Sequence, residues 1–382
     1  MSETAEKSGF KIETSSLRAY TMLGAMVLVW LFFYWQTDGI FLSPRNLSNL
    51  MLQTSVTGIL AVGMLMLIVA GQIDLSVGSV LGLAGGVAAI VMANGYGLGF
   101  SILAAVAVGI IIGVFQGSLA AYLNIPAFIV TLGGLLAWRG AVKFVTQSET
   151  IPVADANFRL IGQSYIPPFV GWILAGTAIF FVLLMTYKKI GASREFEENG
   201  AANPTAEILK SLLPIAGIAV FIYEMNAFLG VPIPVLIFLV VALLGYFITN
   251  NTTFGRYLYA IGGNADAARL SGINNKINIL KVFALLGALT GIASIIFTAR
   301  VGSASPDAGT LKELDAIAAC VIGGASLVGG RGTIFGACLG ALIMASLDNG
   351  MSLLNVRDFM QEIIKGSILV AAVGLDMAGK KS

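Results

Sequence analysis

The 382-residue sequence contains no histidine, only two cysteines, and few charged residues, which make up 11% of the chain. The lack of histidine excludes an imidazole proton relay, an imidazole metal ligand and a Ser-His-Asp triad. Cys320 and Cys338 lie in apolar runs without metal-ligand spacing, so we expect two small buried side chains. There is no phosphate-binding G-x-x-x-x-G-K-[ST] loop and no nucleophile-base pair. The sequence therefore predicts no catalytic residue, no metal site and no nucleotide site of its own.

The chain is instead rich in hydrophobic residues, which make up 57% of it, and its mean hydropathy is +0.89. A soluble protein of this length needs more charge to cover its surface, and a net charge of +2 does not indicate nucleic acid. We predict an all-α, polytopic transmembrane helical bundle of 10–12 spans, some of them broken or re-entrant. The candidate segments lie near 19–36, 47–70, 75–94, 99–122, 126–146, 169–187, 211–229, 232–249, 279–300, 313–330, 333–350 and 358–377.

The positions of lysine and arginine predict the orientation, because these residues collect in cytoplasmic loops. The leader, the loops after the sixth and eighth segments and the tail hold most of these basic residues, so we expect both termini in the cytoplasm. The predicted regions are a cytoplasmic leader 1–18, a transmembrane domain 19–377 with cytoplasmic loops 188–210 and 250–278, and a cytoplasmic tail 378–382. Arg139 and Lys143, near the outer end of the fifth segment, do not fit this pattern.

Polar residues interrupt the apolar segments at two places, where they are costly and therefore informative. The first is "AGQIDLSVGSV", and the second opens with Asp315 and ends with two polar residues in "SLDNG". In both, an acid stands before a glycine-interrupted apolar run, which suggests an internal repeat. The polar residues either cap helix ends, near the periplasmic face in the second case, or face a polar solute at a broken helix. Candidates for the translocation path or its gate are Gln72, Asp74, Ser76, Asp315, Asp348 and Asn349.

One stretch on the cytoplasmic side, "GNADAARLSGIN", has the start and stop signals of a short soluble helix. Asn264 is a suitable N-cap, Asp266 favours the positive helix end, and Gly272 ends the run. The helix is either a tidy solvent-exposed loop or a contact for a soluble partner, with a flat alanine pair and the forked donor of Arg269. The residues assigned to this contact are Asn264, Asp266, Ala267, Ala268, Arg269, Leu270, Ser271 and Gly272.

Several long blocks resemble permease subunits of bacterial ABC sugar importers of the ribose/xylose-type branch. They include "AVGMLMLIVAGQIDLSVGSVLGLAGG", "IPAFIVTLGGLLAWRGAV" and "YAIGGNADAARLSGIN", and the similarity runs from about residue 38 to the C-terminus. A departure is the polar insert "TYKKIGASREFEENGAANPTAEILK", which is longer than the ribose-type plan and leaves the number of spans open.

The resemblance implies a permease that translocates a pentose across the bacterial inner membrane, with D-xylose favoured and ribose, arabinose or galactose as alternatives. It implies a separate cytoplasmic ATP-binding subunit, a periplasmic sugar-binding protein and a second permease copy as partners, within membrane lipid and without nucleic acid. The chain itself would bind no cofactor, and the partner subunit would use ATP. The short helix from Asn264 to Gly272 would then transmit the ATPase cycle to the membrane domain.

Two other classes stay open on the residues alone. An ion-gradient-driven secondary sugar transporter would need a coupling acid or a histidine relay, and the chain has no histidine. A passive channel or a structural membrane subunit would not need a helix shaped for a cytoplasmic partner. Replacing Arg269 with glutamate separates these classes, because only the ATP-driven importer depends on that contact.

Overall fold

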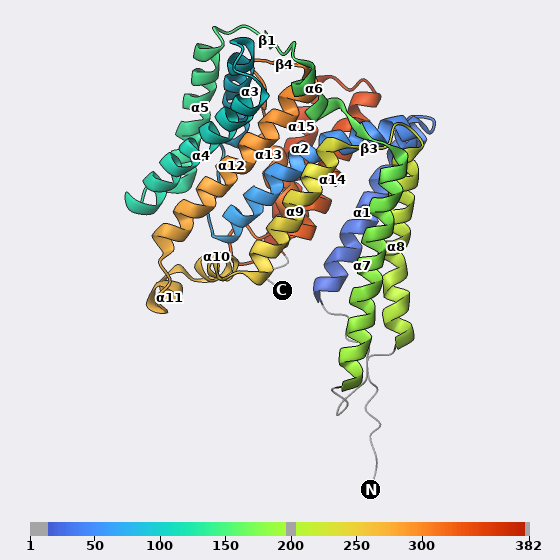
Figure 1. Ribbon diagram of the computed structural model, residues 1–382. Coiled ribbons are helices and arrows are strands. Elements are labelled where there is room, and N and C mark those ends of the chain that lie inside the picture. Colours follow the sequence, from blue (N-terminus) through green and yellow to red (C-terminus); the bar gives the residue numbers. More distant parts are fainter. Residues whose placement is uncertain (1–13, 196–203, 379–382) are drawn as a thin grey trace.

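The computed structural model describes residues 14–195 and 204–378, and these are almost entirely helical (Figure 1). The long helices are α1 (Thr14–Gln36), α2 (Pro44–Val69), α3 (Val77–Ala93), α4 (Leu98–Tyr122), α5 (Ala127–Val145), α7 (Pro168–Glu195), α8 (Pro204–Asn226), α9 (Ile233–Asn251), α12 (Asn275–Val301), α14 (Ile334–Leu353) and α15 (Asp358–Ala378). The short helices are η1 (Ile40–Leu42), α6 (Ala156–Gln163), α10 (Thr253–Gly263), α11 (Ala265–Leu270) and α13 (Lys312–Ile322).

The predicted fold class, a polytopic helical bundle, is confirmed. Each of the twelve apolar segments contains a helix, and eight helices in the described ranges are long and apolar enough to cross a membrane. The segment 313–330 is the one that changes most, because α13 has 11 residues and is about 16 Å long. That is about half of a hydrocarbon core of roughly 30 Å, so α13 is a half-helix.

Other segment ends differ from the sequence prediction. The helix α1 begins at Thr14, inside the predicted leader 1–18, and residues 1–13 lie outside the described part. Helix also occupies part of the range 188–210 predicted as loop, because α7 continues to Glu195 and α8 begins at Pro204. Residues 196–203 and 379–382 lie outside the described part as well.

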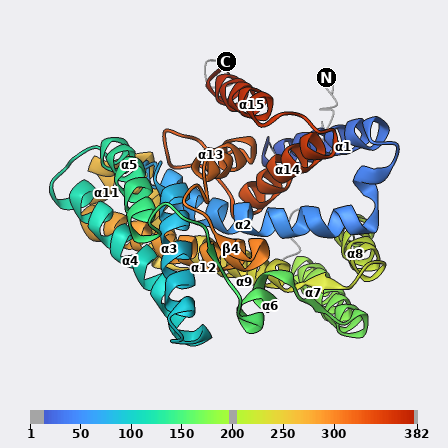
Figure 2. The ribbon, with the colours of Figure 1, turned by 90° about the horizontal axis from the view of Figure 1, so that it is seen from above.

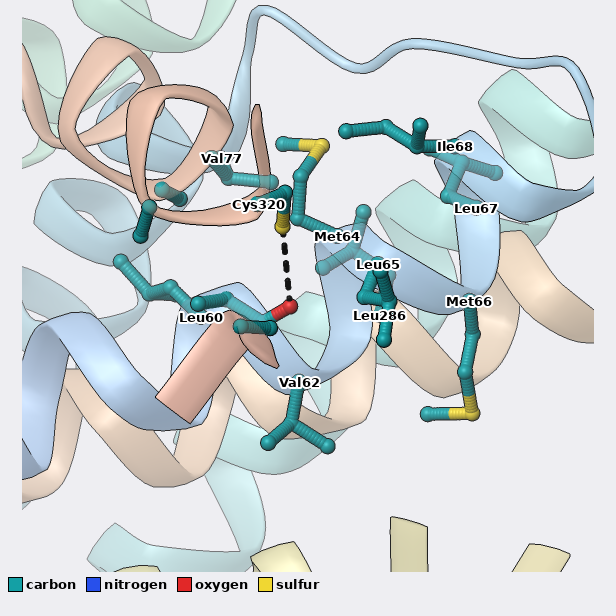
Figure 3. Close-up of a cluster of buried hydrophobic side chains, with 14 of the residues drawn as sticks. Leu60, Val62, Met64, Leu65, Met66, Leu67, Ile68, Val77, Leu286 and Cys320 are labelled. Atoms are coloured by element: carbon teal, nitrogen blue, oxygen red, sulfur yellow. Dashed lines mark hydrogen bonds between the residues drawn. The ribbon is translucent and has the colours of Figure 1, made fainter. Parts of the chain in front are cut away.

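Helix α2 lies at the centre of the bundle, with α13 and α14 on one side and α3, α12 and α9 on the other (Figure 2). From Ile59 to Val69 it is apolar around its whole circumference, and Leu60, Leu65 and Leu67 are fully buried (Figure 3). A helix of this kind is stable only when neighbours cover every face. Cys320 of α13 is buried against α2 as expected, and its Sγ donates to the Ala61 carbonyl at 3.3 Å.

Glycines bring the backbones of α4 and α12 into direct contact. A Cβ atom added to Gly109 would overlap the carbonyl of Gly287, and one added to Gly287 would overlap the carbonyl of Gly109. In a bilayer, where apolar burial gives no advantage over lipid, such close packing supplies much of the attraction between helices. Glycine on both helices therefore joins α4 to α12 at close range.

The helix contacts repeat in the two halves of the chain, in agreement with the suggested internal repeat. In α2–α5 and again in α12–α15, a long helix precedes a short broken one and two longer helices. Helix α4 packs on α12 while α14 packs on α2, and α3 packs on α12 while α13 packs on α2. Helix α2 ends beside α10 and α12 begins next to α11, so the two repeats run in opposite directions (Figure 1).

The two ends of the bundle are different. Two antiparallel strand pairs, β1 (Ile151–Pro152) with β4 (Ser303–Ala304) and β2 (Tyr165–Ile166) with β3 (Val231–Pro232), lie toward one end. The helices α10 and α11 lie at the other end (Figure 1). Since the basic loops accompany α10 and α11, the lysine and arginine distribution assigns that end to the cytoplasm.

Candidate functional site

The half-helix α13 and the broken-helix segment α3 begin next to each other inside the bundle. A Cβ atom on Gly78, in the first turn of α3, would overlap the Glu313 carboxylate and the Gly309 carbonyl next to α13. The first turn of a helix has unpaired N–H groups and a partial positive charge. Two such ends at one place form a polar junction, of the kind that binds polar solutes in transporters with discontinuous helices.

Asp74 and Ser76 form a buried polar cluster at this junction. The Asp74 carboxylate accepts hydrogen bonds from the Ser76 backbone N–H at 2.6 Å and from the Ser76 hydroxyl at 2.7 Å. The Gln116 side chain of α4 donates to the same hydroxyl at 2.9 Å. Thr131 of α5 donates to the carbonyl of Ile73 at 3.3 Å. Asp74 therefore orders the turn before α3, and the cluster joins the linker to α4 and α5.

Two polar atoms near the junction have no hydrogen-bond partner among the described residues. They are Nε1 of Trp138 and Oε2 of Glu313, and both atoms are buried. Trp138 belongs to the cluster, since a Cβ atom on Gly134 would lie 3.0 Å from its Nε1 and would overlap the Gln116 amide. An unmatched donor and an unmatched acceptor at a polar junction are suited to a hydroxyl-rich solute, because each would gain its missing hydrogen bond.

The sequence did not single out these three residues, Gln116, Trp138 and Glu313. The signal was weak, because a glutamine or a tryptophan in a long apolar helix has many ordinary roles. Glu313 stands two positions before Asp315, at the start of an apolar run, where an acid commonly caps a helix. Gln72, which was selected, lies half-buried in the linker after α2 and makes none of the hydrogen bonds that hold the cluster.

The position of Arg139, which did not fit the predicted orientation, has a structural reason. Its guanidinium donates to the carbonyls of Pro306 at 3.2 Å and of Ala308 at 2.7 Å. These carbonyls belong to the irregular segment that leads into α13, which has few backbone partners of its own. Arg139 thus holds this segment against α5, and the exposed Lys143 lies 3.9 Å from Asp307 beside it.

Asp315 and Asp348, which were selected separately as path or gating candidates, lie together because both bind the same two lysines. Lys312 lies 2.6 Å from Asp315 and 3.7 Å from Asp348, and Lys365 of α15 lies 3.1 Å and 2.7 Å from the same two carboxylates. Asp315 is only 2% exposed. The expectation of helix caps near the periplasmic face is wrong for Asp348, which lies inside α14 and pairs with lysine. The four residues form an ion network that joins α13, α14 and α15.

Asn349, the next selected residue, lies on a different contact. Its amide exchanges two hydrogen bonds with the amide of Asn46, at 2.8 and 3.1 Å, and Asn46 also donates to the Phe41 carbonyl at 2.8 Å. Both asparagines are buried. This reciprocal pair ties the end of α14 to the start of α2.

The predicted short helix is present as α11. The Asn264 side chain accepts the hydrogen bond of the Ala267 N–H at 3.0 Å, and Gly272 after the helix has φ of 85°. Asp266 and Arg269 are exposed and lie 3.7 Å apart. The expected flat alanine pair is not exposed as a pair, because Ala268 is buried while Leu270 is 83% exposed.

Helix α10 precedes α11 and was not predicted, although Thr252 caps it through the Gly255 N–H at 3.1 Å. It touches both linkers of the broken helices. A Cβ atom on Gly262 would overlap the Val69 carbonyl at the end of α2 and lie 2.7 Å from the Gly330 nitrogen after α13.

The two linkers also bind each other beside α10, through the Gly330 N–H and the Val69 carbonyl at 2.9 Å. The Tyr259 hydroxyl of α10 donates to the Gly332 carbonyl at 2.7 Å. Burial raises the pKa of the Tyr259 phenol, so the group keeps the proton that it donates. The α10–α11 segment is therefore in contact with the linkers after both α2 and α13.

Comparison with known proteins identifies relatives along nearly the whole chain. The family described as "Branched-chain amino acid transport system / permease component" matches residues 46–373. The xylose transport system permease protein XylH of Haemophilus influenzae is 47% identical over 374 residues, which cover 97% of this chain and 99% of that protein. The XylH protein of Escherichia coli K12 is 45% identical over 97% of this chain and 94% of that protein. The ribose import permease protein RbsC of the same strain is 37% identical over 88% of this chain and 87% of that protein. No solved structure matches the chain.

Proposed function

Because this chain belongs to the permease family of bacterial ABC sugar importers, we propose that it carries D-xylose through the inner membrane in an ATP-driven importer. It is a multi-pass inner-membrane transport subunit of the pentose branch. The observation that carries the choice of xylose is the identity of 45–47% with xylose permeases over 97% of the chain, against 37% with a ribose permease.

An importer of this family works with an ATPase and a sugar-binding protein. In our proposal a cytoplasmic ATP-binding subunit supplies the energy, a periplasmic sugar-binding protein delivers the pentose, and a second copy of this chain completes a homodimer. The chain binds no cofactor itself, and ATP is used by the partner subunit. A channel formed by two copies needs only weak sugar contacts, because selectivity then rests with the binding protein.

We place the sugar path at the junction of α3 and α13. Asp74 and Ser76 line it there, and the unmatched polar atoms of Trp138 and Glu313 support this choice, because sugar hydroxyls would satisfy both. Lys312 and Asp315 belong to the first turn of α13, next to Glu313, and their ion network with Asp348 and Lys365 serves as the contact that holds α14 and α15 during gating. Gln72 lies in the linker before α3 and moves with that helix. Asn349 holds the C-terminal end of α14 through its pair with Asn46.

The ATPase cycle enters through the residues from Asn264 to Gly272. Since α10 touches the linkers after both α2 and α13, a displacement of α11 by the ATPase shifts both broken helices at once. Arg269 and Leu270 are the exposed residues of this helix that offer a forked donor and an apolar contact. Ala268 faces inward and fixes the helix to the rest of the chain.

The test is uptake of labelled xylose into membrane vesicles that contain this chain, its ATPase and a xylose-binding protein, with ATP inside and no ion gradient. We expect uptake that requires both partners and falls by about tenfold or more in Arg269→Glu, because a charge reversal at a buried contact costs more than about 1.4 kcal/mol. Lys188→Glu is the matched control, since Lys188 is also exposed on the α11 side and lies on α7. Its uptake should equal that of the wild type.

Three results would contradict the proposal. Uptake by the chain alone under a proton or sodium gradient would indicate a secondary transporter. Equal loss of uptake in the Arg269 and Lys188 variants would show that charge at this face matters in general, and not the α11 contact. Competition by ribose, arabinose or galactose at the concentration that saturates xylose uptake would change the assigned sugar.

A further inference from the structure

Two cavities lie side by side at the α10 end of the bundle, beneath α1 and α15. The first has a volume of about 400 Å³ and lies among α1, α9, α10 and the loop after α13. The second, of about 520 Å³, lies among α1, α15 and the facing parts of α13 and α14. They share Met22 of α1 and Gly324 of the loop, so the two cavities adjoin there, and the two together are referred to as one space.

The two parts of this space have different chemistry. The second cavity is lined almost entirely by aliphatic groups, among them Ala25, Ile343 and Ala371. The first contains the polar groups of Asn250 and Arg331. The Arg331 side chain is exposed, and no carboxylate of the described residues lies within ion-pair distance of it. The space therefore joins an apolar groove to a single uncompensated positive charge.

The position of the space matches the surface of one leaflet. Arg331 follows Gly330, which binds the end of α2 beside α10, whereas the groove lies along α1 and α15 and reaches Ile343 of α14 and Ile368 of α15. The lysine and arginine distribution assigns this end to the cytoplasm, where basic pockets between transmembrane helices bind anionic headgroups. We propose that this space binds an anionic phospholipid, with the phosphate at Arg331 and an acyl chain in the groove between α1 and α15.

A bound lipid would act close to the linkers. Arg331 lies between Gly330, which binds the Val69 carbonyl, and Gly332, which accepts the Tyr259 hydroxyl. A phosphate held at Arg331 restricts this loop and so stabilises its contact with α10. The site does not depend on the identity of the sugar, and lipid binding can be measured on the purified chain without the ATPase or the sugar-binding protein.

The experiment uses the full-length chain purified in a mild detergent, and native mass spectrometry measures the bound lipid. The probes are phosphatidylglycerol, phosphatidylcholine with the same acyl chains, and soluble glycerol phosphate. We expect phosphatidylglycerol to bind at least about fivefold more tightly than phosphatidylcholine, which corresponds to about 1 kcal/mol for one arginine at the membrane surface. The variant Arg331→Gln should lose this preference. The variant Arg256→Gln should keep it, because Arg256 is exposed on α10 and does not line the space.

A second pair of variants tests the groove. Ala371→Phe fills it from α15 and should weaken binding of phosphatidylglycerol about tenfold, while Val370→Phe, at a neighbouring exposed position that does not line it, should not. Equal binding of the two lipids, or retention of the preference in Arg331→Gln, would overturn the proposal. Binding of glycerol phosphate as tight as that of the lipid would also overturn the proposal, because it would indicate a free-phosphate site. Equal effects of the two phenylalanine variants would overturn it too.

Discussion

Removal of one lysine from the buried ion network should destabilise the protein far more than removal of an exposed one. In Lys365→Met the side chain keeps its length, but Asp348 loses its partner at 2.7 Å and Asp315 loses one at 3.1 Å. Two carboxylates then share Lys312, and the network carries one uncompensated negative charge. Breaking a buried pair in this way costs about 3–5 kcal/mol. The matched control Lys143→Met removes an exposed pair at 3.9 Å and should cost about 0–1 kcal/mol.

The measurement is the free energy of unfolding of the purified chain in mixed detergent micelles, followed by circular dichroism. The double variant Asp315→Asn with Lys365→Met restores neutrality, so we expect it to be less destabilised than the sum of the two single variants by roughly 2–3 kcal/mol. Additive single and double variants would refute the reasoning, because independent effects would mean that the charges do not interact. A cost of Lys365→Met no larger than that of Lys143→Met would refute it too.

Three further results are expected. Gly287→Val should destabilise the protein by about 1–3 kcal/mol or reduce its yield, because the new side chain overlaps a carbonyl of α4. The control Gly133→Val should cost little, because the space around its Cβ position is open. Thermal unfolding in detergent distinguishes the two variants. Asn46→Leu should cost about 1–3 kcal/mol by leaving the buried Asn349 amide unpaired, and the double leucine variant should recover part of this in the same assay. Tyr259→Phe removes the hydrogen bond between α10 and the linker after α13, so it should cost about 0.5–1.5 kcal/mol in stability. It should also reduce vesicle uptake at unchanged expression. Unchanged uptake would contradict the proposed transmission from α11 through α10 to the linkers.

The fold class follows from hydropathy, because a bilayer forces apolar segments of fixed length into helices. The position of α11 could be predicted from the sequence as well, because its cap Asn264 and its terminal Gly272 are local signals. For α13 the sequence indicated a glycine-interrupted run but not where the helix ends, because the glycine-rich turn after Ile322 also contains apolar residues, as a span does. The residue at which a helix ends within an apolar segment depends on the tertiary packing of that segment.

The site was predicted in part for a related reason. Asp74 and Ser76 stand out because they interrupt an apolar run, but their partner Gln116 is 40 residues away and its role depends on the packing of α4. The lysines that pair with Asp315 were not selected, since Lys312 and Lys365 are separated by 53 positions and each resembles an ordinary residue at a segment end. Long-range pairs of this kind need the fold before they can be identified.

The composition of the ion network has an electrical consequence. Two lysines and two aspartates sum to zero, and all four lie within one group on α13, α14 and α15. Moving one uncompensated charge through the membrane field would involve about 2.3 kcal/mol per 100 mV, whereas a neutral group that moves as a unit does almost no electrical work. A change in membrane potential therefore does not favour either position of this network as long as its four residues move together.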